Sequence, residues 1–101
     1  MKHSLRTEHI ELTDSDKEKL EDNLNRLEKH ITMPYVTDVT ISHDTHHTHG
    51  KVTRCIIIIQ CGKKVYRTER SEDTVQDAID SAASAMRSEL ASDHDKKKDH
   101  N

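Results

Sequence analysis

The chain is poor in the residues that build ligand loops and stacking surfaces: it has two glycines, one proline, two tyrosines and no tryptophan or phenylalanine. So few glycines exclude a glycine-rich loop that cradles a phosphate group. The scarcity of aromatic side chains removes the platforms on which the bases of single-stranded RNA usually stack. No apolar run approaches the ~20 residues of a membrane span, and the N-terminal residues lack the apolar core of a signal peptide. We therefore expect a soluble, cytoplasmic protein with no membrane partner.

The 101 residues are 31% apolar and 35% charged, with a formal net charge of −3. The apolar residues are clustered along the chain, which favours one small domain with a thin core over a disordered chain. No nucleophile motif is present, and a domain of this size offers no obvious cleft. The sequence therefore predicts a protein that is not an enzyme and carries no cofactor.

Apolar side chains recur at helical spacing in two segments. The first segment predicts a helix over about residues 14–31, with a stripe of Leu20, Leu24, Leu27 and Ile31. The second predicts a helix from about residue 73 or 74, with a stripe of Val75, Ile79, Ala82, Met86 and Leu90. Alternating patterns predict strands at about residues 3–7, 39–43, 52–61 and 64–70. Residues 93–101 carry no apolar side chain, so we expect a single domain over residues 1–92 and then a disordered polar tail.

This order of elements, β-α-β-β-β-α, predicts an α+β two-layer sandwich. A right-handed crossover would make the first two strands parallel, and hairpins would join the rest into a four-stranded mixed sheet with both helices on one face. The strand at residues 52–61 is apolar on both of its faces, because Ile56 and Ile58 alternate with Cys55, Ile57 and Ile59. We therefore expect Ile56 and Ile58 to be exposed in a monomer, where they would form a homodimer interface or a docking site.

The two cysteines do not suit a disulfide. Cys55 and Cys61 are six residues apart on one predicted strand, which separates them by ~20 Å. Free thiols fit a reducing cytoplasm. Cys55 shares a face with the core isoleucines and is expected to pack as a small hydrophobe.

Histidines are concentrated in the predicted hairpin between the second and third strands, at positions His43, His46, His47 and His49. Imidazoles on the two arms of a hairpin can converge on one Zn²⁺ or Ni²⁺ ion. However, no cysteine is near, and polar hairpin tips tolerate many sequences. These histidines are therefore weak candidates for metal ligands, and an ordinary polar hairpin remains the alternative.

Charge is unevenly distributed along the chain: residues 1–35 sum to −2, residues 36–71 to +3 and residues 72–101 to −4. Cations that neutralise phosphates supply most of the affinity of proteins for nucleic acids. The candidates for RNA contact are Lys17, Arg26, Lys29, Arg54, Lys63, Lys64, Arg67, Arg70 and Arg87.

Two segments resemble a known family. Glu11-Leu12-Thr13, followed by Arg26-Leu27-Glu28-Lys29, is similar to the first helix of the ribosome hibernation promoting factors, also called ribosome-associated inhibitors or sigma factor modulation proteins. The stretch from Arg67-Thr68-Glu69 to Ala78-Ile79-Asp80 resembles the same family. The likeness covers about residues 3–92 and suggests a short form.

The resemblance implies a translation inhibitor that occupies the mRNA and tRNA channel of the small ribosomal subunit in stationary phase or stress. Basic side chains would contact rRNA phosphates, and no reaction would be catalysed. The second helix departs from the family pattern, because Ala85, Ser88 and Ser92 stand where basic residues are usual. The alternative hypothesis is a self-associating module of the same fold without rRNA affinity, possibly with metal bound at the histidine hairpin.

Overall fold

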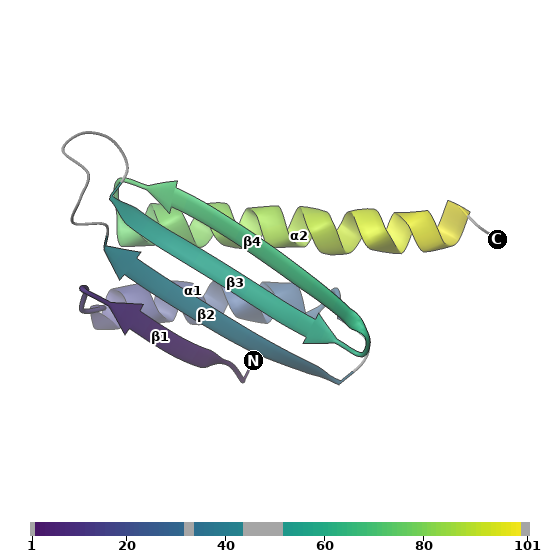
Figure 1. Cartoon of the computed structure of the whole chain (residues 1–101), viewed down its shortest axis with the longest axis horizontal. Helices are drawn as coiled ribbons and strands as arrows, with labels where there is room; N and C mark the ends of the chain where they lie inside the picture. The colour runs from purple at the N-terminus through teal and green to yellow at the C-terminus, as the bar shows by residue number, and fades with distance from the viewer. Residues whose placement is uncertain (1, 32–33, 44–51, 100–101) are drawn as a thin grey trace.

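The computed structural model describes residues 2–31, 34–43 and 52–99, with side chains up to residue 92. Its elements are β1 (Ser4–Glu8), α1 (Asp14–Glu28), β2 (Tyr35–His43), β3 (Thr53–Cys61), β4 (Lys64–Glu72) and α2 (Val75–Asp99). Both helices lie on the same face of the four strands (Figure 1). The predicted α+β two-layer sandwich is therefore confirmed.

The sheet has the strand order β1-β2-β3-β4. As predicted, β1 runs parallel to β2, whereas β2, β3 and β4 are antiparallel neighbours. The register aligns Val39 with Ile57 and Ile57 with Thr68. Strand β2 is longer than the sequence pattern predicts, because residues 35–37 also pair with the end of β3.

The core lies between the sheet and the helices. In β2 and β3 every second residue is buried beneath the helices, including Ile41, Cys55, Ile57 and Ile59. The predicted helical stripes meet this face through Leu20, Leu24, Ile79 and Met86. Strict alternation is what a sheet covered on one side requires, because neighbouring side chains of a strand point to opposite faces.

Helix α1 begins at a capping box. The Thr13 hydroxyl accepts a hydrogen bond from the Asp16 amide, and the Asp16 carboxylate accepts one from the Thr13 amide, both at 3.0 Å. The Gln76 side chain of α2 donates to the same carboxylate at 3.1 Å. Burial opposes ionisation of Asp16, but these hydrogen bonds outweigh it and lower the pKa of Asp16. The cap thus fixes both the start of α1 and its contact with α2.

Helix α1 ends at Glu28, earlier than the predicted residue 31. The amides of His30 and Ile31 bond to the carbonyls of Leu27 and Glu28, three residues back, so the last turn tightens and leaves the α-helix. Ile31 still packs against the core, which is why the apolar stripe extends past the helix.

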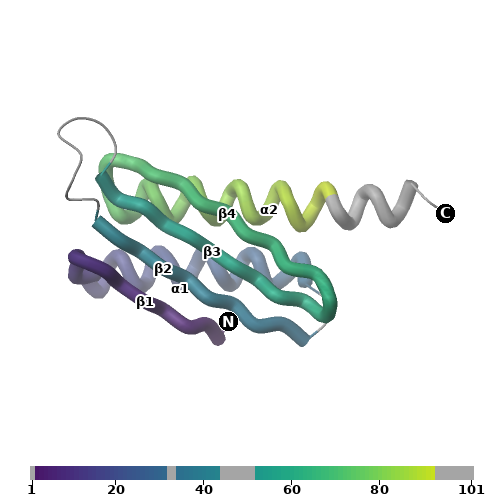
Figure 2. The backbone as a smooth tube through the Cα atoms, in the orientation of Figure 1, coloured from purple at the N-terminus to yellow at the C-terminus, as the bar shows by residue number. Residues whose placement is uncertain are grey.

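The two helices lie side by side and run in the same direction (Figure 2). The Gln76 side chain donates a hydrogen bond to the hydroxyl of Ser15, in the first turn of α1, at 3.2 Å. Further along, the Asp80 carboxylate accepts a hydrogen bond from Asn23 at 3.0 Å and lies 3.3 Å from the Lys19 ammonium. Polar bridges therefore join α1, from its first turn to Asn23, to the first two turns of α2.

Helix α2 begins after Thr74, whose hydroxyl accepts a hydrogen bond from the Asp77 amide. This start agrees with the prediction. The helix continues to Asp99, into the segment for which a polar tail is predicted, and the tail stays a prediction. Among the described residues, neither helix is both long enough and apolar enough to cross a membrane.

One expectation about the helix-free face is wrong. Ile56 and Ile58 point to that face, but they are half-buried rather than exposed, because side chains of the neighbouring strands cover part of them. The large apolar side chains that are most exposed on that face are Val36 and Val65, which flank Gln60.

Candidate functional site

The basic residues predicted to contact RNA fall into three places. Five lie at the end of the sandwich where α1 ends and β4 begins: Arg26, Lys29, Lys63, Lys64 and Arg87. Two, Arg54 and Arg67, lie on the helix-free face of the sheet. Lys17 lies in the first half of α1, and Arg70 lies near the end of β4. Only the first group gathers cations from both helices, β4 and the β3–β4 turn.

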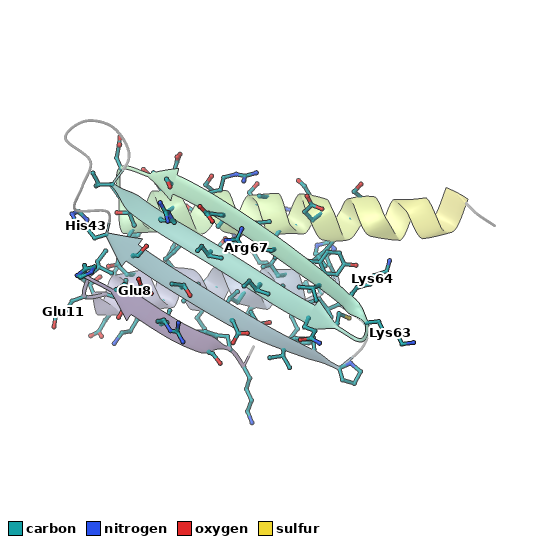
Figure 3. All side chains as sticks on the ribbon, viewed as in Figure 1. Glu8, Glu11, His43, Lys63, Lys64 and Arg67 are labelled. Carbon is teal, nitrogen blue, oxygen red and sulfur yellow. The ribbon has the colours of Figure 1, made fainter. Side chains whose placement is uncertain are left out.

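Chain topology explains why this first group converges. The end of α1 leads into the start of β2, which pairs with the end of β3, and the β3–β4 turn closes the same end. Gly62 adopts a φ of 62°, the left-handed region, and this makes the tight turn that carries Lys63 and Lys64. Figure 3 shows the two lysines projecting from this turn, far from Glu8, Glu11 and His43 at the opposite end.

Arg26 and Arg87 line a shallow groove between the two helices. The groove has a volume of about 210 Å³, and its walls include Leu27, Ala83 and Ser84. Both arginines are exposed. Asn23 and Asp80, which are hydrogen-bonded to each other, also line the groove. Two guanidinium groups facing one groove suit an anion that bears several oxygens, such as a phosphate.

A sixth cation, Lys2, was missed by the sequence analysis. It lines a hollow with Tyr35, Val36 and Thr37, the first residues of β2, and so belongs to the same end. Only the parallel register of β1 and β2, which aligns Ser4 with Asp38, brings it there. We call Lys2, Arg26, Lys29, Lys63, Lys64 and Arg87 the basic end.

Three cations of the basic end are available to a ligand. Arg26, Lys29 and Lys63 form no ion pair with another described residue. The hydroxyl of Tyr35 donates a hydrogen bond to the nearby Glu28 carboxylate. Burial is the larger cause that raises the pKa of Tyr35, and this hydrogen bond is the second. Side chains that are not already neutralised can exchange their counterions for phosphates at a gain in free energy.

Arg54 and Arg67 are in a different situation. Both contact Glu69: the Arg54 Nε lies 3.6 Å and the Arg67 guanidinium 2.7 Å from its carboxylate oxygens. Figure 3 places Arg67 over the middle of the sheet, away from the lysine turn. Arg67 is only three residues from Lys64 in the sequence, but the pleat and the strand length separate the two side chains.

The opposite end of the sandwich is rich in carboxylates. It carries the end of β1, the starts of both helices and the end of β4, with Glu8, Glu11, Asp14, Asp16, Glu72, Asp73 and Asp77. Acidic residues in the first turns of α1 and α2 also favour the helix dipoles. The domain is therefore polarised along its strands.

Of the four metal-ligand candidates only His43 is described, at the end of β2. His46, His47 and His49 lie outside the described residues. Within the part of the chain that the structure describes, no three metal-ligating side chains come together. Metal binding at this hairpin stays a prediction.

Both cysteines are free, as expected, and their surroundings differ. Burial raises the pKa of the Cys55 thiol to about 12, whereas Cys61 is half-buried at the end of β3. Because the thiolate is the reactive form, we expect a small thiol reagent at about pH 8 to label one cysteine in the native chain and two in the unfolded chain. Peptide mapping should place the native label on Cys61. Equal labelling rates at the two positions would contradict this assignment.

Comparison with known proteins agrees with this architecture. Residues 4–98 match the family described as Sigma 54 modulation protein / S30EA ribosomal protein. The chain belongs to this family. The matched region contains every strand, both helices and all of the basic end except Lys2. No curated protein sequence matches the chain.

Two solved structures resemble the chain in fold. The N-terminal domain of Protein Y from Thermus thermophilus superposes with a TM-score of 0.72 at 20% identity and covers 89% of this chain and 96% of that one. A ribosomal subunit interface protein from Coxiella burnetii has a TM-score of 0.67 at 10% identity, with 88% and 94% covered. At such identities the likeness establishes the shared fold, and the charged surface of this chain must be judged from its own residues.

Proposed function

We propose that this protein binds the small ribosomal subunit through its basic end and inhibits translation by occupying the channel of mRNA and tRNA during stationary phase or stress. The domain acts as a non-catalytic plug. Its family includes ribosomal proteins by description, and a solved relative of its fold is a ribosomal subunit interface protein. The observation that carries the proposal is the convergence of six cations from separate elements on one end of the sandwich.

The chemistry of the basic end favours contacts with the RNA backbone. The surface offers guanidinium and ammonium groups but no tryptophan or phenylalanine for stacking on bases. Such a surface recognises the position and shape of phosphates rather than a base sequence. A folded rRNA channel presents phosphates in a fixed arrangement, which suits a rigid sandwich.

The separation of a basic end from an acidic end determines how the domain is oriented on rRNA. The acidic end, with Glu8 and Glu11 in Figure 3, is repelled by rRNA, so the basic end enters the channel first. A net charge of −3 is therefore compatible with RNA binding, because the charges that matter are separated along the molecule.

Cosedimentation with purified small subunits tests the proposal. If about five cations of the basic end replace counterions, affinity should fall roughly 100-fold between about 50 mM and 200 mM salt. Subunits loaded beforehand with mRNA and initiator tRNA should retain less protein than empty subunits. Translation of a reporter in an extract should decrease in proportion to bound protein.

Two results would count against the proposal. Absence of binding at the lower salt concentration would leave the alternative of a self-associating module without rRNA affinity. Binding that is equally strong on loaded and empty subunits would place the protein outside the channel. The large subunit serves as the control for nonspecific attraction to rRNA.

A further inference from the structure

The helix-free side of the sheet, here called the open face, is formed by the even-numbered residues of β1, β2 and β3 and the odd-numbered residues of β4. None of the described helices covers it (Figure 1). The groove between the helices lies on the other side of the sheet, and the basic end adjoins the open face only at its edge, where Val36 lies beside Lys2. The function proposed above therefore leaves most of this surface unused.

The open face carries an apolar patch toward its end at the β3–β4 turn. Val36 and Val65 are 60% and 61% exposed, and both flank Gln60 in the register. Ile58 follows on the next rung and Ile56 on the one after, both half-buried. Two of the three most exposed large hydrophobic side chains in the described residues thus adjoin an isoleucine pair on one face. Such a contiguous apolar patch on a small polar domain is typical of an interaction surface.

The rest of the open face, here called its rim, carries charges of both signs in equal numbers. It has three cations and three anions: Arg6, Arg54, Arg67, Glu8, Asp38 and Glu69. Arg54 and Arg67 share Glu69, and Asp38 lies on the same rung as Arg67, so these four charges sum to zero. A surface with no net charge has no electrostatic attraction for RNA, but it complements another surface of the same composition.

We propose that two copies of this chain associate through their open faces, with Val36, Ile58 and Val65 at the centre of a twofold interface. In an isologous dimer each patch meets its own copy, so the patch must be complementary to itself. An apolar patch and a rim with matched numbers of opposite charges meet this condition. A strongly acidic or basic partner would leave half of the rim charges facing like charges.

The size of the face sets the strength of the dimer. Four strands spaced about 4.8 Å apart and about 30 Å long give roughly 500 Å² per protomer, or about 1,000 Å² in total. This is the lower limit for specific interfaces, so the dimer should be weak and concentration-dependent. The inference stands whether or not the protein binds ribosomes.

Sedimentation equilibrium of the full chain provides the first test, at concentrations up to about 500 µM, where an interface of this size is populated. The wild type should be in monomer–dimer equilibrium. Ile58→Glu and Val65→Glu should each weaken the dimer at least about 10-fold, because each substitution buries a charge in the apolar patch of the interface. The matched control is Leu5→Glu, which replaces a residue that is 39% exposed but points to the helix side, and which should leave the dimer unchanged.

Charge complementation provides the second test and does not depend on the apolar variants folding. One variant carries Glu8→Lys with Asp38→Lys, and the other carries Arg6→Glu with Arg67→Glu. Each alone should be monomeric, because its rims repel, whereas an equimolar mixture should form a heterodimer. Different affinity tags on the two variants allow the heterodimer to be quantified.

A wild type that stays monomeric at about 500 µM overturns the proposal, as does a mixture of the two charge variants that shows no more association than either alone. Association that survives Ile58→Glu also overturns it, because the copies would then meet elsewhere. None of these experiments contains ribosomes, so their failure leaves the proposed function intact.

Discussion

Replacing Ile57 with alanine is expected to lower the free energy of unfolding by about 3–4 kcal/mol, a large part of the stability of a domain of this size. Ile57 is completely buried in the middle of the central strand β3, between the sheet and both helices. Truncation removes apolar surface and leaves a cavity that the flanking strands cannot close, because their backbone pairing is fixed. Urea denaturation followed by circular dichroism measures the loss.

The adjacent Ile58→Ala is the matched control. It has the same chemistry and the same strand, but its side chain is half-buried on the open face. We expect a loss of about 1 kcal/mol when unfolding is measured at low protein concentration, where the proposed dimer is dissociated. Equal losses for the two variants would show that the helices do not cover the face of the sheet that carries Ile57.

Reversing two charges of the basic end, with Arg26→Glu and Arg87→Glu, is expected to reduce affinity for the small subunit by about 10²–10³-fold. The two arginines line one groove from separate helices, and both are exposed, so the change should spare the fold. The reversal removes two phosphate contacts and adds two repulsions. Cosedimentation at a single salt concentration measures the effect, and circular dichroism verifies the fold.

The control variant changes the net charge by the same four units, but on the open face instead of the basic end. Arg6→Glu with Arg67→Glu changes the open face, and at physiological salt charges beyond about 8 Å are largely screened from the basic end. This variant should bind the subunit within about threefold of the wild type. If it loses as much affinity as the groove variant, the open face and its arginines would belong to the rRNA contact.

Much of the fold could be predicted because its signals are local and periodic. Leucines of α1 spaced by four and three residues require one helical face, and the alternation of Val39 and Ile41 requires a half-buried strand. The Thr13 cap and the Thr74 start are likewise short-range. The end of α1 was misplaced because Ile31 keeps its core contact after the helix has tightened and ended.

The candidate site was harder to predict from the sequence than the fold. The basic residues could be listed from the sequence, but the sequence did not show that they divide between a basic end and an open face without net charge. Arg67 and Lys64 are three residues apart, and only the direction of β4 shows that one lies over the sheet and the other at its turn. The carboxylate of Glu69 that engages Arg67 was visible in the sequence, although its contact with Arg54 depends on the β3–β4 register.

The scarcity of glycine and aromatic residues by itself excluded phosphate loops and base stacking, and hydrophobic spacing by itself determined the elements and the sandwich. These conclusions need only local geometry, because a helix or strand sorts its side chains within a few residues. The tertiary structure alone decided which charges meet. It brought Lys2 to the basic end through a parallel register and placed Val36 beside Val65 across β3. Electrostatic and apolar surfaces arise from distances between segments, and such distances are set only when the strands pair and the helices pack.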